Sequence, residues 1–170
     1  MSLLMILLPL ADPAEPGGAT GSRLDCFLGP FFTLRDSGQR IVLASPEGGF
    51  PWTRLSRDDE VDTALMRRFR ADRAAREEVN DTLRLDQIYA EDFDGAFCVG
   101  QSGAIRDNSS AAARLISTFL QSGKPVALVP AAVDIAPAGS GNSVLIVDDH
   151  RGSSLIIAEA LIIATKSKLD

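Results

Sequence analysis

Short apolar runs, separated by longer segments with helical periodicity, constrain the fold of this chain more than any other feature of its sequence. Each run has the length of a β-strand and lacks the alternation of a strand that faces water on one side, which is typical of strands covered on both faces in a parallel sheet. We therefore expect parallel strands buried between layers of helices. The runs are Leu4–Leu10, Arg40–Ala44, Asp94–Val99, Pro125–Val129 and Val144–Val147.

The segments between these runs carry the spacing of amphipathic helices. Arg23–Ser37 places apolar side chains three and four residues apart, and Gly38 follows as a typical residue beyond a helix end. Thr82–Ile88 is compatible with either an extended or a helical connector. Strands that alternate with helices predict right-handed crossovers and a three-layer α/β sandwich around a mostly parallel sheet, in a single domain over residues 1–170. The other predicted helices are Asp58–Val79, Ser109–Ser122 and Ser153–Thr165.

The charge balance and the scarcity of metal-binding side chains exclude several kinds of site. A net charge of -6 argues against a nucleic-acid surface, because that surface needs clustered Lys and Arg. The basic residues of Asp58–Val79 are interleaved with acidic ones, which predicts a solvated helix face with mixed ion pairs. Cys26 and Cys98 lack metal-ligand or redox spacing, so we expect no metal, no cofactor and a reducing cytoplasm. The basic residues are Arg67, Arg68, Arg70, Arg73 and Arg76.

The apolar opening of the chain reads as the first strand and not as a signal peptide, because it lacks a basic start. Residues Met1–Leu3 are interpreted as a short remnant of cloning in front of that strand. No apolar run approaches the roughly 20 residues that span a bilayer, so no membrane segment is expected.

Several segments, taken in order, resemble the ThiJ/PfpI family of the class I glutamine amidotransferase-like superfamily. The combination of ASPEGG after the second strand with the DFDG strand and its glycine turn is the most specific part of this resemblance. The resemblance covers most of the chain and implies a flavodoxin-like fold. The matching segments are ATGSRLDCFLGPFFTLRDSG, IVLASPEGG, AEDFDGAFCVGQSG, ARLISTFLQSGKPVALV and SSLIIAEAL.

The resemblance also implies positions for a catalytic apparatus, and this chain departs from the family at most of them. The family's acidic residue on the first helix falls on Asp25, which keeps a carboxylate but is one methylene shorter. The turn that helps to form the oxyanion hole falls on Gly100, Gln101, Ser102 and Gly103, where Ser102 replaces a histidine and Gln101 a glycine.

The nucleophilic cysteine of the family's elbow falls on Pro130, which Ala131 and Ala132 follow. Because the elbow residue needs a positive φ and proline fixes φ near about -65°, we expect the elbow itself to be absent. The short span between Pro130 and Val144 also predicts loss of the element that covers the family's site. The sequence therefore predicts a vestigial pocket and a non-catalytic domain with a binding, regulatory or dimerisation role.

A hydrolase with a relocated nucleophile is the alternative that the sequence leaves open. It would be an amidase- or protease-like or a glyoxalase-like enzyme. Cys98 stands one residue before the glycine turn, although a buried free cysteine is common as a small apolar filler. A relay of Ser102, His150 and Asp148 or Asp149 is the other possibility.

Two further features concern ligands and partners. The PGGATGS segment before the first helix could hold an anion through Ser22 and Arg23, or could be a plain connecting turn, since it lacks a P-loop lysine and a GxGxxG pattern. The last helix is apolar on nearly all sides, which favours a homodimer. A small-molecule ligand is expected at the carboxyl ends of the strands.

Overall fold

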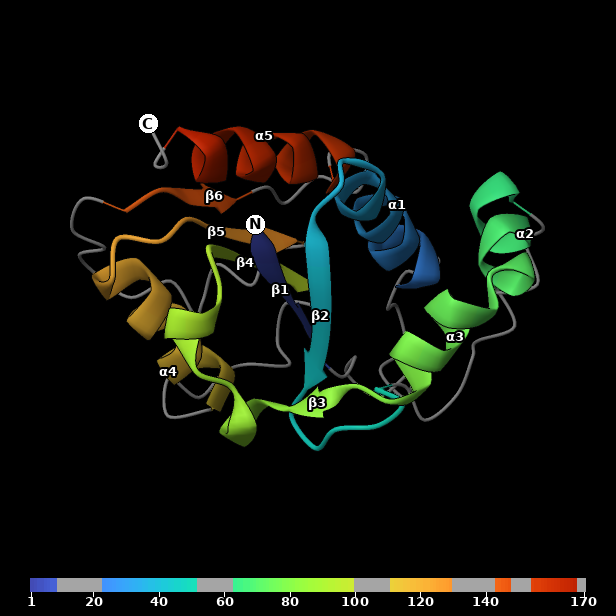
Figure 1. Ribbon diagram of the computed structural model, residues 1–170, viewed down its shortest axis with the longest axis horizontal. Helices are drawn as coiled ribbons and strands as arrows, with labels where there is room; N and C mark the ends of the chain where they lie inside the picture. Colours follow the sequence, from blue (N-terminus) through green and yellow to red (C-terminus); the bar gives the residue numbers. More distant parts are fainter. Residues whose placement is uncertain (9–22, 52–62, 100–110, 130–142, 148–153, 168–170) are drawn as a thin grey trace, which may run out of the picture.

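The computed structural model describes residues 1–8, 23–51, 63–99, 111–129, 143–147 and 154–167, with only the backbone described at 23–26, 145 and 147. Its strands form one sheet in the order β3-β2-β1-β4-β5-β6, and every pair of neighbours is parallel (Figure 1). Without the two-residue β3, this is the 2-1-3-4-5 order of flavodoxin-like folds. The strands are β1 Ser2–Leu7, β2 Arg40–Ser45, β3 Leu83–Arg84, β4 Gly95–Val99, β5 Val126–Val129 and β6 Leu145–Val147.

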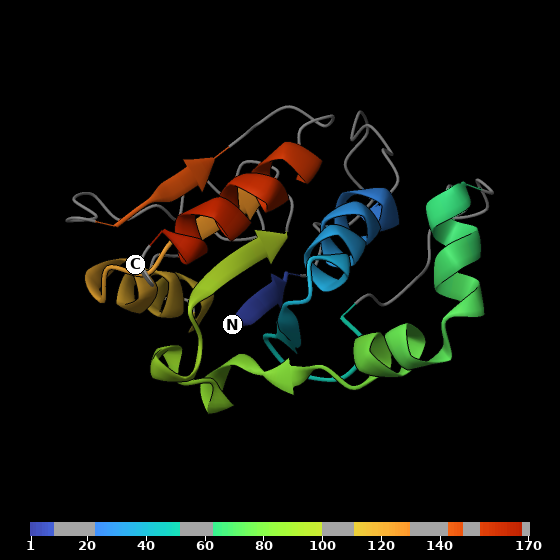
Figure 2. The same ribbon diagram turned by 45° about the horizontal axis from the view of Figure 1, so that its top comes forward.

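Helices cover both faces of this sheet, as the sequence predicts. Helices α1 and α5 lie against each other on one face, and α4 lies on the other, with the short helices η2 and η3 beside it (Figures 1 and 2). The predicted three-layer α/β sandwich is confirmed. The helices are α1 Arg23–Asp36, α2 Ala64–Ala71, α3 Arg73–Asn80, α4 Ala111–Gln121, α5 Ser154–Lys166, η2 Leu85–Gln87 and η3 Ala90–Asp92.

Alternate side chains of the strands enter two separate hydrophobic cores, one on each face of the sheet. In β1, Leu3, Met5 and Leu7 join the core under α1 and α5, whereas Leu4 and Ile6 join the core under α4. All five are at most 1% exposed. Apolar residues at every strand position are therefore required by burial on both faces.

The ends of several elements differ from the sequence predictions. The strand predicted at Leu4–Leu10 begins at Ser2 and ends at Leu7, and Leu3 pairs with Ile41 and Gly95. Ser2 and Leu3, interpreted above as lying in front of the first strand, belong to it. The described helices include none that is long and apolar enough to cross a membrane.

The helix predicted at Asp58–Val79 is interrupted. In the described residues it consists of α2, whose first turn is capped by the Thr63 hydroxyl, and α3, which begins after Asp72. Asp72 has an extended backbone, with φ -87° and ψ 98°, and its side chain accepts a hydrogen bond from the Ala75 N–H. An aspartate that caps the second helix thus ends the first one.

Candidate functional site

The carboxyl ends of the strands form the edge at which this fold places its sites. The strand order reverses between β1 and β4, and open α/β sheets bind ligands outside the carboxyl ends at such a switch point. The Leu8 N–H donates to the Val99 carbonyl at 2.8 Å, so these two neighbouring strands stay joined to their last residues. We therefore take this edge as the candidate site.

The segments predicted to form the glycine turn and the elbow each begin directly after a strand that the structure describes. Val99 and Val129 are register partners in β4 and β5. Gly100 and Pro130 are the next residues in the chain, so the topology attaches the two segments to adjacent strand ends. The residues themselves lie outside the described part of the chain: Gly100, Gln101, Ser102, Gly103, Pro130, Ala131 and Ala132.

The other sequence-predicted residues are placed only in part. Asp25 and Arg23 belong to the first turn of α1, the helix that follows β1, but their side chains are not described. The side chain of Cys26 is not described either. Ser22 and His150 lie outside the described residues, together with Asp148 and Asp149, so the anion site and the serine relay stay predictions.

Cys98 points into the protein and not toward the carboxyl edge. Its strand partners are Ile6 and Leu128, and it belongs to the core under α4. The side chain is 0% exposed, and burial raises the pKa of the thiol from its ordinary value of 9.0 to about 12. A thiol is reactive as the thiolate, so this environment keeps Cys98 inert. The structure thus favours the interpretation of Cys98 as a small apolar filler.

Sequence reasoning missed a buried hydroxyl pair formed by the last residue of β2 and the residue that precedes β3. Ser45 and Thr82 are 2% and 5% exposed, and their hydroxyl oxygens lie 2.8 Å apart. The Thr82 hydroxyl donates its proton to the Gly49 carbonyl, so Ser45 is the donor to Thr82. The Gly49 N–H in turn donates to the Thr82 carbonyl at 2.9 Å. Both hydroxyl protons are engaged, so this pair fixes the loop after β2 and has no proton free for catalysis.

Two glycines in that loop have backbone conformations that disfavour other residues. Gly48 and Gly49 have φ of +75° and +67°. A Cβ on Gly48 would lie 2.7 Å from the Cγ of Arg84 and 3.2 Å from the Thr82 carbonyl oxygen. The signal in the sequence was the ASPEGG segment itself, because paired glycines after a strand are typical of a turn with positive φ. Its partner Thr82 could not be inferred, since it lies in a connector without clear periodicity.

The outer rim of this loop carries an exposed ion pair. Arg84 donates to the two carboxylate oxygens of Asp86 at 3.1 and 2.7 Å. This hydrogen bonding lowers the pKa of Asp86 and raises that of Arg84. Both groups therefore stay charged near neutral pH. Among the described residues, no three His, Cys, Asp or Glu side chains are grouped so that they could hold a metal ion.

Comparisons with known proteins show what this arrangement resembles. No protein-family model matches the chain, and no curated protein matches it by sequence. Solved structures match it over nearly its whole length. Glyoxalase III from Candida albicans is 16% identical, with a TM-score of 0.71 and coverage of 96% of this chain and 98% of that one.

Two other solved structures give the same result. A ThiJ/PfpI domain protein from Brachyspira murdochii is 16% identical, with a TM-score of 0.64 and coverage of 98% and 96%. DJ-1 from Toxoplasma gondii is 17% identical, with a TM-score of 0.53 and coverage of 96% and 92%. At such identities the likeness establishes the fold and leaves the chemistry open. The resemblance seen in the sequence is thus confirmed for the architecture: the chain has the fold of the ThiJ/PfpI and DJ-1 proteins.

Proposed function

We propose that this chain is a single, cytoplasmic ThiJ/PfpI-like domain without the family's catalytic activity. The observation that carries the proposal is the residue after β5: the position that matches the family's cysteine holds Pro130. Proline supplies no nucleophile. It also fixes φ near about -65°, whereas a nucleophile elbow needs a positive φ. Replacement of the cysteine by proline thus removes both the reactive atom and the strained turn that presents it.

The role that remains for such a domain is to bind a ligand or a partner. A small molecule would bind at the carboxyl edge, where the loop after β2 is fixed by the Ser45 and Thr82 hydroxyls. A second copy of the chain would bind at α5. There Leu155, Ile156 and Ile163 are 45%, 67% and 65% exposed, on a face of the helix that also carries the exposed Glu159. A homodimer through α5 is the arrangement that we propose.

Turnover by the purified protein tests the absence of catalysis. We expect no activity toward methylglyoxal, glycated amines or activated esters and amides. Measurable turnover that Asp25→Ala abolishes would contradict the proposal, because the family's acid would then still serve chemistry. Asp86→Ala is the matched control, since it removes an exposed carboxylate from the rim and not from the predicted pocket.

A hydrolase with a relocated nucleophile is the second candidate, and the structure weakens one of its two versions. The Cys98 version requires a thiolate, but burial raises the pKa of this thiol to about 12. A thiol-reactive probe at neutral pH should therefore label native Cys98 far more slowly than a cysteine in a model peptide. Fast labelling would revive this version. The Ser102 and His150 version predicts an activity that Ser102→Ala and His150→Ala both remove.

Sedimentation of the purified chain tests the homodimer independently of catalysis. Ile156→Glu and Ile163→Glu place charges on the exposed face of α5 and should convert the dimer into a monomer. Tyr89→Glu is a suitable control, because Tyr89 is 63% exposed and is the N-cap residue of η3. That short helix lies beside α4, away from α5 (Figure 1). A wild-type monomer at high protein concentration would refute this part of the proposal.

A further inference from the structure

Helix α5 is fixed to the molecule by one face and presents the opposite face outward. Ile157, Ala158, Leu161 and Ile162 are at most 9% exposed and belong to the core under α1 and α5. The helix runs along the outside of the sheet, next to α1 (Figures 1 and 2). Because the buried face anchors α5 in the core, the side chains of the outer face keep fixed positions relative to one another.

The outer face carries isoleucines and charged residues at intervals of seven residues. Ile156 and Ile163 are 67% and 65% exposed, and Glu159 and Lys166 are exposed as well. At about 100° per residue, two residues that are seven positions apart differ by only about 20° around a helix. The two isoleucines therefore form the middle of the face, and Glu159 and Lys166 lie together on one flank of it. This spacing is typical of a helix that pairs with another helix.

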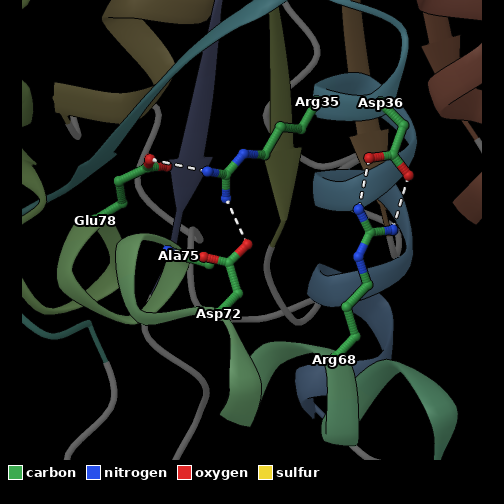
Figure 3. A network of polar contacts seen from close by, with 6 residues as sticks. All are labelled: Arg35, Asp36, Arg68, Asp72, Ala75 and Glu78. Carbon is green, nitrogen blue, oxygen red and sulfur yellow. Dashed lines mark hydrogen bonds and ion pairs between the residues drawn. The ribbon is translucent and has the colours of Figure 1, made fainter.

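The charges at the end of α1, the helix beside α5, are directed toward α2 and α3. Asp36 accepts from Arg68 of α2 at 2.7 and 2.6 Å, and Arg35 donates to Asp72, the N-cap residue of α3, at 3.2 Å (Figure 3). A partner that binds the outer face of α5 would leave these contacts in place.

A second copy of α5 complements the charges of this face in the antiparallel direction. A two-fold axis perpendicular to two antiparallel helices brings the same flank of both together, and residues before the axis meet residues after it. With the axis level with the bond between Leu161 and Ile162, Glu159 of each copy comes within reach of Lys166 of the other. A parallel pair would place each charge at the level of its own copy, so it would bring no opposite charges together.

The same antiparallel arrangement packs the apolar residues. Ile163 of one copy is level with Ala160 of the other, whose small, half-buried side chain lets the two helices approach closely. Ile156 is level with Ser167, directly after the end of α5. The overlap from 156 to 167 is about 17 Å long. One short helix from each copy makes a small interface, so we expect a weak dimer in which the charged pairs decide the orientation.

We propose that α5 binds a second copy of this chain in the antiparallel direction, with a Glu159–Lys166 pair on each side of the two-fold axis. This inference rests on the proposed homodimer and specifies how its two copies are oriented. Glu159 and Lys166 thereby select the partner, because another exposed apolar helix would not match both charges.

Reversal of single charges tests the pairing. Glu159→Lys or Lys166→Glu replaces both ion pairs with like-charge contacts, so the Kd of the dimer in analytical ultracentrifugation should rise by about tenfold or more at low salt. The double variant Glu159→Lys/Lys166→Glu has opposite charges again, and its Kd should return to within about threefold of the wild-type value. Asp92→Lys is the matched control, because it changes the net charge as Glu159→Lys does but lies in η3, beside α4.

A mixture of the two single variants provides the decisive comparison. In a heterodimer of Glu159→Lys with Lys166→Glu, each charge on the flank meets an opposite one, so the mixture should dimerise more tightly than either variant alone. A wild-type dimer that tolerates both reversals as it tolerates Asp92→Lys would refute the pairing and leave the homodimer. A tighter dimer of Glu159→Gln would also overturn it, since the two Glu159 side chains would then face each other. A wild-type chain that stays monomeric would refute the homodimer and the pairing together.

Discussion

Replacing Gly95 with alanine tests how tightly the start of β4 is enclosed between its neighbours. Gly95 lies opposite Leu3 of β1, beneath the last turn of α5. A Cβ there would lie 2.9 Å from the Cγ2 of Thr165 and 3.0 Å from the Pro125 carbonyl oxygen. Both are distances that real side chains avoid, so something must move.

Neither neighbour of Gly95 can move freely. The Thr165 hydroxyl bonds to the carbonyls of Leu161 and Ile162 at 2.9 and 3.0 Å, which fixes the direction of its methyl group. The Pro125 carbonyl accepts the Ala96 N–H at 3.1 Å and belongs to the backbone. Overpacking a fixed site costs about 1–3 kcal/mol. Alanine regains about 0.5–1 kcal/mol of chain entropy, so we expect a net loss in the free energy of unfolding of about 0–2.5 kcal/mol, centred near about 1 kcal/mol. Tm should fall by about 2–4 °C for each kcal/mol lost.

Two other variants make the test specific. Gly29→Ala meets the Cδ2 of Leu155 at 3.0 Å, a similar approach, but that atom ends a flexible side chain that is 45% exposed. Because alanine favours the helix by about 0.8–1 kcal/mol, Gly29→Ala should be neutral or stabilising. Thr165→Ser in the Gly95→Ala background removes the methyl group and should restore part of the loss. Urea and thermal unfolding followed by circular dichroism give the values. Equal losses for Gly95→Ala and Gly29→Ala would refute the distinction between fixed and movable neighbours.

The other predictions concern the buried thiol of Cys98 and two glycines with positive φ, Gly38 and Gly48. Because burial raises the pKa of Cys98 from 9.0 to about 12, the folded protein keeps a proton that the unfolded chain releases, so stability falls as pH rises through this window. Between about pH 8 and about pH 10.5, the free energy of unfolding of the wild type, measured with urea, should fall by about 2 kcal/mol more than that of Cys98→Ala. Equal falls would contradict the raised pKa of Cys98. Gly38→Ala should lower the free energy of unfolding by about 1–2 kcal/mol, because the φ of Gly38 is +78°. A Cβ added there meets nothing within 4 Å, so this loss comes from the backbone conformation alone. Gly48 has a φ of +75°, and a Cβ added there would also crowd Arg84 and Thr82. Gly48→Ala should therefore lower the free energy of unfolding by at least about 1 kcal/mol more than Gly38→Ala does. Equal losses for the two variants would show that this crowding has no cost.

The layered architecture could be predicted from the sequence because a strand that is buried on both faces carries an apolar residue at every position. Leu3 to Leu7 are apolar without a break, since alternate side chains enter two different cores. The strand ends could not be predicted from the same signal. Leu8 remains 3% exposed after β1 has ended, so hydrophobicity continues beyond the last paired residue.

The elements that the sequence did not reveal depend on contacts between distant residues. The two residues of β3, Leu83 and Arg84, are both exposed and carry no strand pattern; they are extended because they pair with Ala44 and Ser45. The break between α2 and α3 was detectable in principle. Asp72 is a good capping residue, but the charges around it maintained a helical pattern on both sides.

The register of β4 limits the chemistry that the carboxyl edge can support. Phe97 and Val99 enter the core under α1 and α5, while Ala96 and Cys98 enter the core under α4. Turning the Cys98 thiol toward the other side would require a shift of β4 by one residue, which would drive Phe97 into the space of Ala96 or Cys98 and reverse every other side chain of the strand. Such a shift would also break the register with β1 and β5 together. Any nucleophile at this edge must therefore come from the segments that follow the strands, so Pro130 and Ser102, and not the buried thiol, decide between a pseudoenzyme and a hydrolase.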